Sequence, residues 1–361
     1  MPQWLRSFWR VINEDLPHLQ ADMKAAQGFK GKAPIFAGIA AKALVTLLFC
    51  VLFVVAFITI LGQENAIVGV VVLLSVLTFQ KIHFGYHTTQ GAISLFGIFV
   101  LFAVVPPLAL YLGGVLSILL MMVTLLLILI VACDRVEFHN HIVLVLSFLL
   151  LYGYPASPQA QLPRVVGLLL GGVWAASIYY RNNQHNDSQR TLGEVFRDFD
   201  PRKKGDEWKL KLAVLVPAAM GCGALLGLDR VMWIGIAAMS VLSPYEHLRA
   251  TKMIERFLGT LAGTALFYAM TLIPGMTPTL VGLSGGFLVG LTSAYRYETI
   301  FNSLGALSVA MLLLGPNESI LARIADNAFA IIFVLVMVFL IDYVVDKWQE
   351  KFGSPADPVE M

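Results

Sequence analysis

Charged residues are scarce in this chain, and their scarcity excludes a water-soluble protein. Only 13% of the 361 residues are Asp, Glu, Lys or Arg, whereas soluble domains carry roughly 25%. Hydrophobic residues make up 58%, more apolar surface than a protein in water can hide. No polar stretch is long enough to build a soluble catalytic domain, so we do not expect an enzyme.

Cysteine is also rare, and its positions exclude a disulfide framework. Cys50, Cys133 and Cys222 lie in or beside apolar runs without metal-ligand spacing. His83 and His87 lack an evident third ligand, and the sequence has no nucleotide-binding loop. We therefore expect no cofactor, no metal site and no nucleic-acid partner. Any energy source must be an ion gradient or a partner protein.

The sequence predicts an all-α polytopic membrane protein with about twelve transmembrane helices. The first apolar run is too long for a cleaved signal peptide, so we expect it to remain as the first span. The expected spans are residues 34–61, 66–84, 91–111, 114–133, 141–154, 162–180, 209–228, 231–243, 252–273, 279–295, 300–314 and 320–344. They form a first six-helix repeat (34–180) and a second (209–344), joined by a basic linker (181–208).

The first 33 residues precede any span and show an amphipathic pattern. Leu5, Phe8, Trp9 and Ile12 recur at helical spacing, which predicts an interfacial helix on the membrane surface. The same pattern also suits a helix that binds a partner.

The basic residues predict the orientation in the membrane. With a cytoplasmic N-terminus, only Arg164, Arg230 and Arg323 lie on the opposite side, which leaves 22 of the 25 Lys and Arg residues in the cytoplasm. Both termini, the linker and the tail at 345–361 are then cytoplasmic.

The two halves resemble each other as tandem repeats. Gly62 precedes Ser75-Val76-Leu77 by 13 positions, and Gly227 precedes Ser240-Val241-Leu242 by the same 13. Arg164 and Arg323 each open the sixth span of a half. Six spans are an even number, so the repeats enter the membrane in the same direction.

Two segments in each half are short: Ala66–Phe79, His141–Tyr154, Val231–Ser243 and Ile300–Leu314. Fourteen helical residues span only about 21 Å, roughly 9 Å less than the hydrocarbon core. The missing length must be irregular backbone that is buried in protein or lines a wet cavity, which points to a transport pathway. A thinned bilayer is the structural alternative.

In the stretch Lys252–Ile273, a positively charged residue lies one helical turn before a face of small residues. Gly259 and Gly263 lie four residues apart, so another backbone can approach closely, and Arg256 lies one turn earlier. We expect Arg256 to contact an anion; the alternative is a headgroup anchor.

The last span holds Arg323, Asp326 and Asn327 on one face. A charge at the bilayer centre costs roughly 2.5 to 3.5 kcal/mol, so such residues persist when paired, solvated or useful. One interpretation is a structural Arg323–Asp326 pair. The other is that Asp326, with Glu255, couples protons while Arg323 and Arg256 bind the substrate.

Trp233 and Tyr245 complete the candidate site. Either they form an aromatic wall for a substrate ring, or they belong to the aromatic belt at the membrane interface.

The second half resembles the fusaric acid resistance (FUSC) family, whose core is shared with aromatic acid exporters and distantly with plant aluminium-activated malate transporters. The resemblance rests on Trp233, on Arg256-Phe257-Leu258-Gly259-Thr260 with Gly263, and on Arg323. It covers about residues 209–344, with a degraded copy at 36–180. The first repeat departs from the pattern, since Gln90-Gly91 stand where the arginine is expected, and the large cytoplasmic domain of many members is reduced to the linker.

The resemblance implies export of small organic anions, often aromatic carboxylates, across the inner membrane of bacteria. With the site residues above, it favours a proton-coupled efflux transporter. An organic-anion channel and a non-transporting membrane scaffold are the alternatives. The expected partners are the substrate anion and the lipid bilayer, with room for a homodimer and for a periplasmic adaptor protein.

Overall fold

The computed structural model describes residues 14, 16–26, 28–185, 188–244 and 246–352, and these residues form helices and loops without a strand. The predicted amphipathic helix at residues 5–12 lies outside the described residues. Before the first long helix comes α2 (Leu16–Ala25), and in the linker lies α9 (Leu192–Arg197).

Each of the twelve predicted segments coincides with one helix. In chain order these are α3 (Gly28–Leu61), α4 (Ala66–Phe79), α5 (Thr88–Leu112), α6 (Gly114–Ala132), α7 (Asn140–Gly153), α8 (Pro158–Asn182), α10 (Lys204–Leu225), α11 (Val231–Val241), α12 (Glu246–Thr271), α13 (Pro278–Val289), α14 (Tyr295–Leu314) and α15 (Pro316–Phe352). Within α3, α5, α6, α8, α10 and α15 lie six stretches that are long and apolar enough to cross a membrane. The protein is therefore a multi-pass membrane protein.

The chain divides into two compact units. Unit 1 contains Met1–Phe53 and Lys252–Ile324, and unit 2 contains Val54–Thr251 and Ala325–Met361. The boundaries between the units fall inside α3, α12 and α15.

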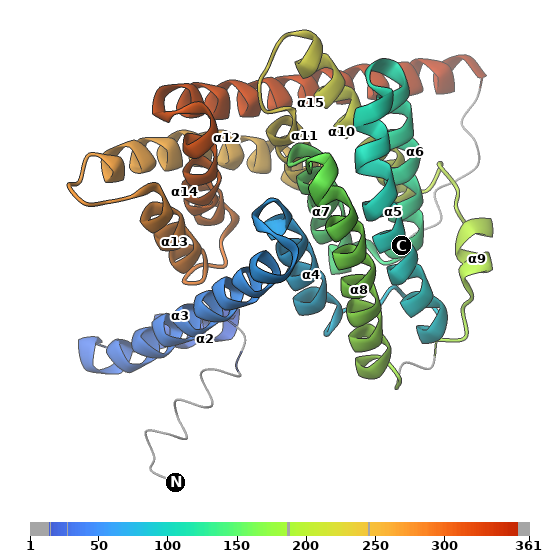
Figure 1. Cartoon of the computed structure of the whole chain (residues 1–361). Helices are drawn as coiled ribbons and strands as arrows, with labels where there is room; N and C mark the ends of the chain where they lie inside the picture. The colour runs from blue at the N-terminus through green and yellow to red at the C-terminus, as the bar shows by residue number, and fades with distance from the viewer. Residues whose placement is uncertain (1–13, 15, 27, 186–187, 245, 353–361) are drawn as a thin grey trace. The chain divides into compact units, whose positions relative to one another are not determined.

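Unit 2 is a bundle built around α5 and α8, which pack against each other along their length. The helices α6 and α7 lie beside α5, and α4 lies beside α7 and α8 (Figure 1). The second half of the chain adds α10 against α6 and α11 against α7. Glycines allow the close approach of α8: a Cβ on Gly171 would lie 2.2 Å from Val72 Cγ2, and one on Gly172 would lie 2.6 Å from Phe99 Cβ.

In unit 1, α13 packs on α14 through small residues. A Cβ on Gly285 would lie 2.7 Å from Leu304 Cβ, and one on Gly290 would lie 2.9 Å from Ala43 Cβ in α3. These glycines of α13 therefore pack within unit 1. The α2 helix joins this unit through Gln20, whose side-chain amide donates to the Leu291 carbonyl at 3.0 Å.

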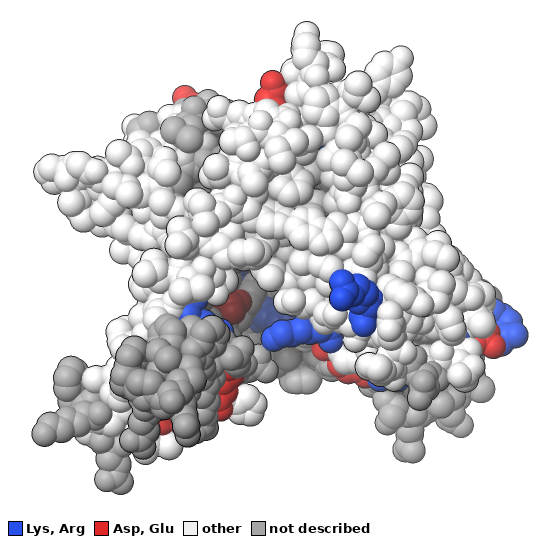
Figure 2. Space-filling view, turned by 60° about the horizontal axis from the view of Figure 1, so that its bottom comes forward, with Lys and Arg blue, Asp and Glu red and all other residues white. Residues whose placement is uncertain are grey.

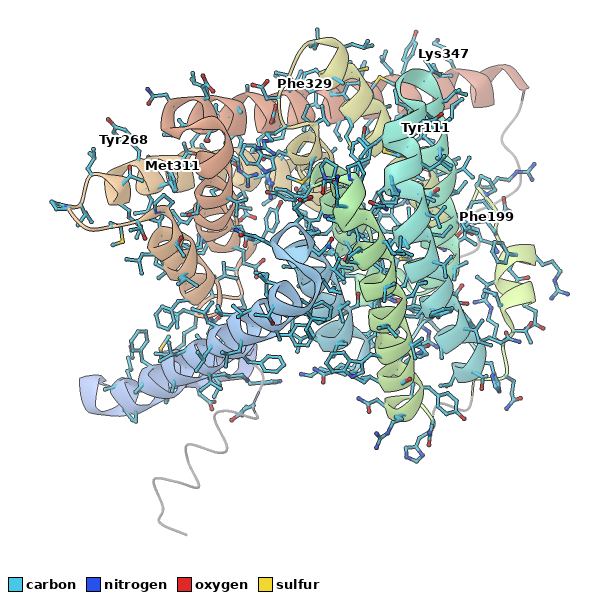
Figure 3. All side chains as sticks on the ribbon, in the orientation of Figure 1. Tyr111, Phe199, Tyr268, Met311, Phe329 and Lys347 are labelled. Atoms are coloured by element: carbon cyan, nitrogen blue, oxygen red, sulfur yellow. The ribbon has the colours of Figure 1, made fainter. Side chains whose placement is uncertain are left out.

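The outer faces of the long helices carry exposed apolar side chains, as lipid-facing surfaces do. Examples in unit 2 are Val115, Leu119 and Val123 on α6, which succeed one another at helical spacing. Uncharged residues cover most of the described surface on the face shown in Figure 2. Tyr111 near the end of α5 and Tyr268 near the end of α12 project outward in Figure 3, with exposed fractions of 86% and 51%.

Three of the four helices predicted to be short are short. The α4 and α7 helices have 14 residues each, and α11 has 11. The prediction for the fourth was wrong: α14 has 20 residues, because it begins at Tyr295 with a polar turn before the apolar run. The neighbouring helix α13, which was not predicted to be short, has only 12 residues.

The irregular backbone after α4 is buried at residues 84–86, and three of its backbone groups make hydrogen bonds. The Phe84 N–H donates to the Tyr179 hydroxyl at 3.0 Å, and the Ser188 hydroxyl donates to the Gly85 carbonyl at 3.1 Å. The His87 N–H donates to the Arg190 carbonyl at 2.8 Å. Of the two predicted environments for irregular backbone, burial in protein or the lining of a wet cavity, this segment shows burial in protein.

The linker gathers at one end of unit 2. Arg190 pairs with Asp134, which follows α6, and with Asp198 at 3.1 Å. The Asn182 side chain donates to the Gln80 carbonyl at 3.0 Å. At the opposite end, Glu64 accepts hydrogen bonds from the Ser157 N–H at 2.7 Å and from its hydroxyl at 3.0 Å. The loops of unit 2 thus form a linker end and a Glu64 end.

Candidate functional site

The glycines of α12 form the close helix seam that the sequence predicts. A Cβ on Gly259 would lie 1.8 Å from Thr299 Oγ1, and one on Gly263 would lie 2.3 Å from the Ile300 carbonyl oxygen, both in α14. Backbone therefore meets backbone at this seam, which only glycine permits. The Thr299 hydroxyl donates across it to the Glu255 carbonyl at 3.3 Å.

Arg256 lies at the start of this seam, on its buried stripe. Its exposed fraction is 6%, and the stripe continues through Thr260 and Thr264 at helical spacing. Glu255 is half-buried. Consecutive residues on a helix point about 100° apart, so the Glu255 side chain lies on a different face from Arg256.

The α15 helix carries the second buried polar group. Arg323 is 3% exposed, and Asp326 and Asn327 are fully buried. These three residues lie on one buried face of α15. This face begins at Ser319 and becomes apolar at Ala330. The predicted common face is therefore a buried face, with its polar part confined to the first three turns.

Of the two aromatic residues predicted for the site, the structure describes only Trp233. Trp233 is 2% exposed inside α11, so it is a core residue of unit 2 and does not fit the interfacial belt. Tyr245 lies outside the described residues. Of the site residues, unit 1 contains Arg256 and Arg323, whereas unit 2 contains Trp233 and Asp326.

Arg164 forms a polar cluster that was not predicted as a site from the sequence. This arginine of α8 is 4% exposed. It donates from Nε to Asn65 Oδ1 at 3.0 Å, from Nη1 to the Tyr154 carbonyl at 2.6 Å and from Nη2 to the Glu64 carbonyl at 2.7 Å. Arg164 thus ties together the start of α4, the end of α7 and the first turns of α8.

A cavity of about 200 Å³ opens beside Arg164 at the Glu64 end of unit 2. Its walls come from the second half of α5, the end of α7, the loop that follows and the start of α8. The lining residues are Phe102, Pro106, Pro107, Leu110, Leu151, Pro155, Ala156, Gln161 and Arg164. The irregular backbone after α7 therefore lines a cavity.

Residues 218–337 match a family model described as fusaric acid resistance protein-like. The match confirms the resemblance over most of the second half of the chain. Neither the search of curated proteins nor that of solved structures finds a match. Together with the apolar helices, the match indicates a membrane protein of the transporter or efflux type, which agrees with the expectation that it is not an enzyme.

Proposed function

We propose that the protein exports small organic acids, aromatic carboxylates above all, from bacteria and couples export to proton movement. Arg256 and Arg323 bind the substrate carboxylate, Trp233 and Tyr245 form a wall for its ring, and Asp326 with Glu255 carries the coupling proton. The observation that carries this proposal is the burial of Arg256 on α12 and of Arg323 on α15, both inside the matched region.

A buried guanidinium in a membrane helix is costly, which supports a functional role. An arginine at the helix centre costs roughly 2.5 to 3.5 kcal/mol on insertion scales, and intramembrane charges mark ion and substrate paths. A planar guanidinium also matches a carboxylate with two parallel hydrogen bonds, and that geometry selects organic acids among anions.

Proton coupling is proposed for Asp326 because its carboxyl group is fully buried on the same helix as Arg323. A carboxylate that loses its charge on protonation changes the local field at the substrate site. Uptake of a proton at Asp326 would thereby weaken or strengthen anion binding, which is what coupling requires.

The proposed setting is the bacterial inner membrane, with twelve crossings, two parallel six-helix repeats and both termini in the cytoplasm. The basic linker supports this orientation, since positive loops face the cytoplasm. A homodimer or a periplasmic adaptor protein belongs to the same proposal.

The first test compares accumulation of labelled benzoate in cells that lack the gene, carry it, or carry an Arg256→Gln variant expressed at the same level. We expect the intact gene to lower cellular benzoate and the Arg256→Gln variant to behave like the deletion. Normal efflux by the variant would remove Arg256 from the site. Large benzoate currents without a coupled ion in voltage-step recordings would identify a channel, and no effect of the gene would favour a scaffold.

A further inference from the structure

We propose that the cavity beside Arg164 is a second anion site, which binds a small carboxylate with an apolar body. This site lies wholly within unit 2 and contains none of the residues of the proposed transport site. It goes beyond the proposed function, since a binding site at the Glu64 end holds whether or not Arg256 carries substrate.

The positive charge of Arg164 favours an anion in the cavity. Its three hydrogen bonds end on two backbone carbonyls and one amide oxygen, all of them neutral. The Glu64 carboxylate is engaged by Ser157, and no carboxylate of the described residues lies within the 4.0 Å of an ion pair with Arg164. The Glu64 carboxylate attracts Arg164 from beyond ion-pair distance. An anion in the cavity would add a counter-charge in direct contact with the guanidinium and would thereby be stabilised.

Arg164 also has hydrogen-bond donors that the described part of the protein does not use. A guanidinium has five N–H groups, and three of them make the bonds above. The other two make no hydrogen bond to the described residues. Arg164 lines the cavity. In the proposed complex these two N–H groups donate to the carboxylate of the ligand.

The walls define the rest of the ligand. Apart from Arg164 and Gln161 they are apolar, with an aromatic ring from Phe102 and leucines at 110 and 151. Pockets for drug-sized ligands measure about 300 to 1,000 Å³, so a cavity of about 200 Å³ suits a ligand with one ring. A benzoate-like molecule combines that size with the required negative charge.

The hydrogen bonds that Arg164 makes fix the cavity in its shape. They hold the Tyr154 carbonyl, directly before Pro155 and Ala156, and the Glu64 carbonyl. The Glu64 side chain in turn accepts hydrogen bonds from Ser157, directly after Ala156. Replacing Arg164 would release both carbonyls and risks unfolding, so a better test fills the cavity and leaves the cluster intact. Ala156 is suitable because it lines the cavity from a loop.

The experiment titrates the full chain in lipid nanodiscs by calorimetry, in an Arg256→Gln background that removes the proposed transport contact. The ligands are benzoate and the neutral benzamide of the same shape. Loss of a charged hydrogen-bond pair is worth at least about tenfold in affinity, so benzamide should bind at least tenfold more weakly. The Ala156→Phe variant should lose benzoate binding, and the matched Gln159→Phe variant, with its ring on an exposed position, should retain it.

Equal affinity for benzoate and benzamide would overturn the proposal, because charge would then play no part. Unchanged benzoate binding by Ala156→Phe would also overturn it. Binding by the wild-type chain that disappears in the Arg256→Gln background would assign the benzoate to the transport site, so failure here is separable from failure of the proposed function.

Discussion

At the scale of single residues, Gly263 is the position where an added methyl group meets the hardest obstacle. Its Cβ would lie 2.3 Å from the Ile300 carbonyl oxygen, which belongs to backbone and cannot rotate away. We expect Gly263→Ala to destabilise the protein by about 1 to 3 kcal/mol through overpacking. Thermal unfolding in detergent measures the effect.

Gly305 in α14 is the matched control for this substitution. No heavy atom lies within 4 Å of the site for its Cβ, and it also lies inside a helix of unit 1. Gly305→Ala should leave the unfolding temperature unchanged or raise it, since alanine favours a helix by up to about 1 kcal/mol over glycine. Equal losses for both variants would show that the α12–α14 seam is not tightly packed.

Residue patterns along one helix could be predicted from the sequence, and contacts between distant residues could not. The spacing of Arg256, Gly259 and Gly263 is visible in the sequence and translates directly into one buried face. The partners of Arg164 lie 10, 99 and 100 residues away, at Tyr154, Asn65 and Glu64. Only the packing of α4, α7 and α8 brings them together.

At the scale of elements, helix existence followed from hydropathy more reliably than helix ends did. The apolar run of the last span starts at Ile320, but α15 starts at Pro316, a residue well suited to the first helical position. Similarly, α14 includes the polar turn at Tyr295–Glu298. Hydropathy predicts only the apolar part of a helix. Backbone hydrogen bonds extend the helix beyond that part into polar residues.

The α9 helix begins with a capping box whose strength depends on pH. The Thr191 hydroxyl accepts from the Glu194 N–H at 3.3 Å, and the Glu194 carboxylate accepts from the Thr191 N–H at 2.8 Å. The hydrogen bond from the Thr191 N–H lowers the pKa of Glu194 below its ordinary value of 4.5. The cap is therefore complete above pH 4.5 and weakens as pH falls through the lowered pKa.

The chemical shift of the Thr191 amide proton reports this titration directly. We expect it to move upfield below pH 4.5 as the acceptor loses its charge. In a Glu194→Gln variant, which keeps the acceptor and has no titrating group, the Thr191 amide should show no such step. A step that persists in the variant would place the titrating group elsewhere.

At the scale of the whole molecule, the two ends of unit 2 should face opposite sides of the membrane. The linker end carries Arg190 and the basic run Arg202-Lys203-Lys204, whereas Glu64 and the Arg164 cavity lie at the other end. Basic loops remain in the cytoplasm, so the linker end should face inward.

Single reporter cysteines test this sidedness, in a background without the three natural cysteines. Both Gln159 and Arg202 are exposed, one near each end of unit 2. A membrane-impermeant maleimide added outside cells should label Gln159→Cys at once and Arg202→Cys only after the membrane is opened. Labelling of Arg202→Cys in intact cells would invert the topology.

Proton-coupled movement of an organic anion through the protein itself is the central step of the proposed function. The direct measurement is benzoate uptake by proteoliposomes of purified protein under an imposed pH gradient, with wild type beside Asp326→Asn. We predict that uptake by the wild type follows the gradient and that Asp326→Asn loses this dependence. Wild-type uptake that is independent of the gradient, or an unaltered gradient dependence in Asp326→Asn, would contradict proton-coupled transport through Asp326.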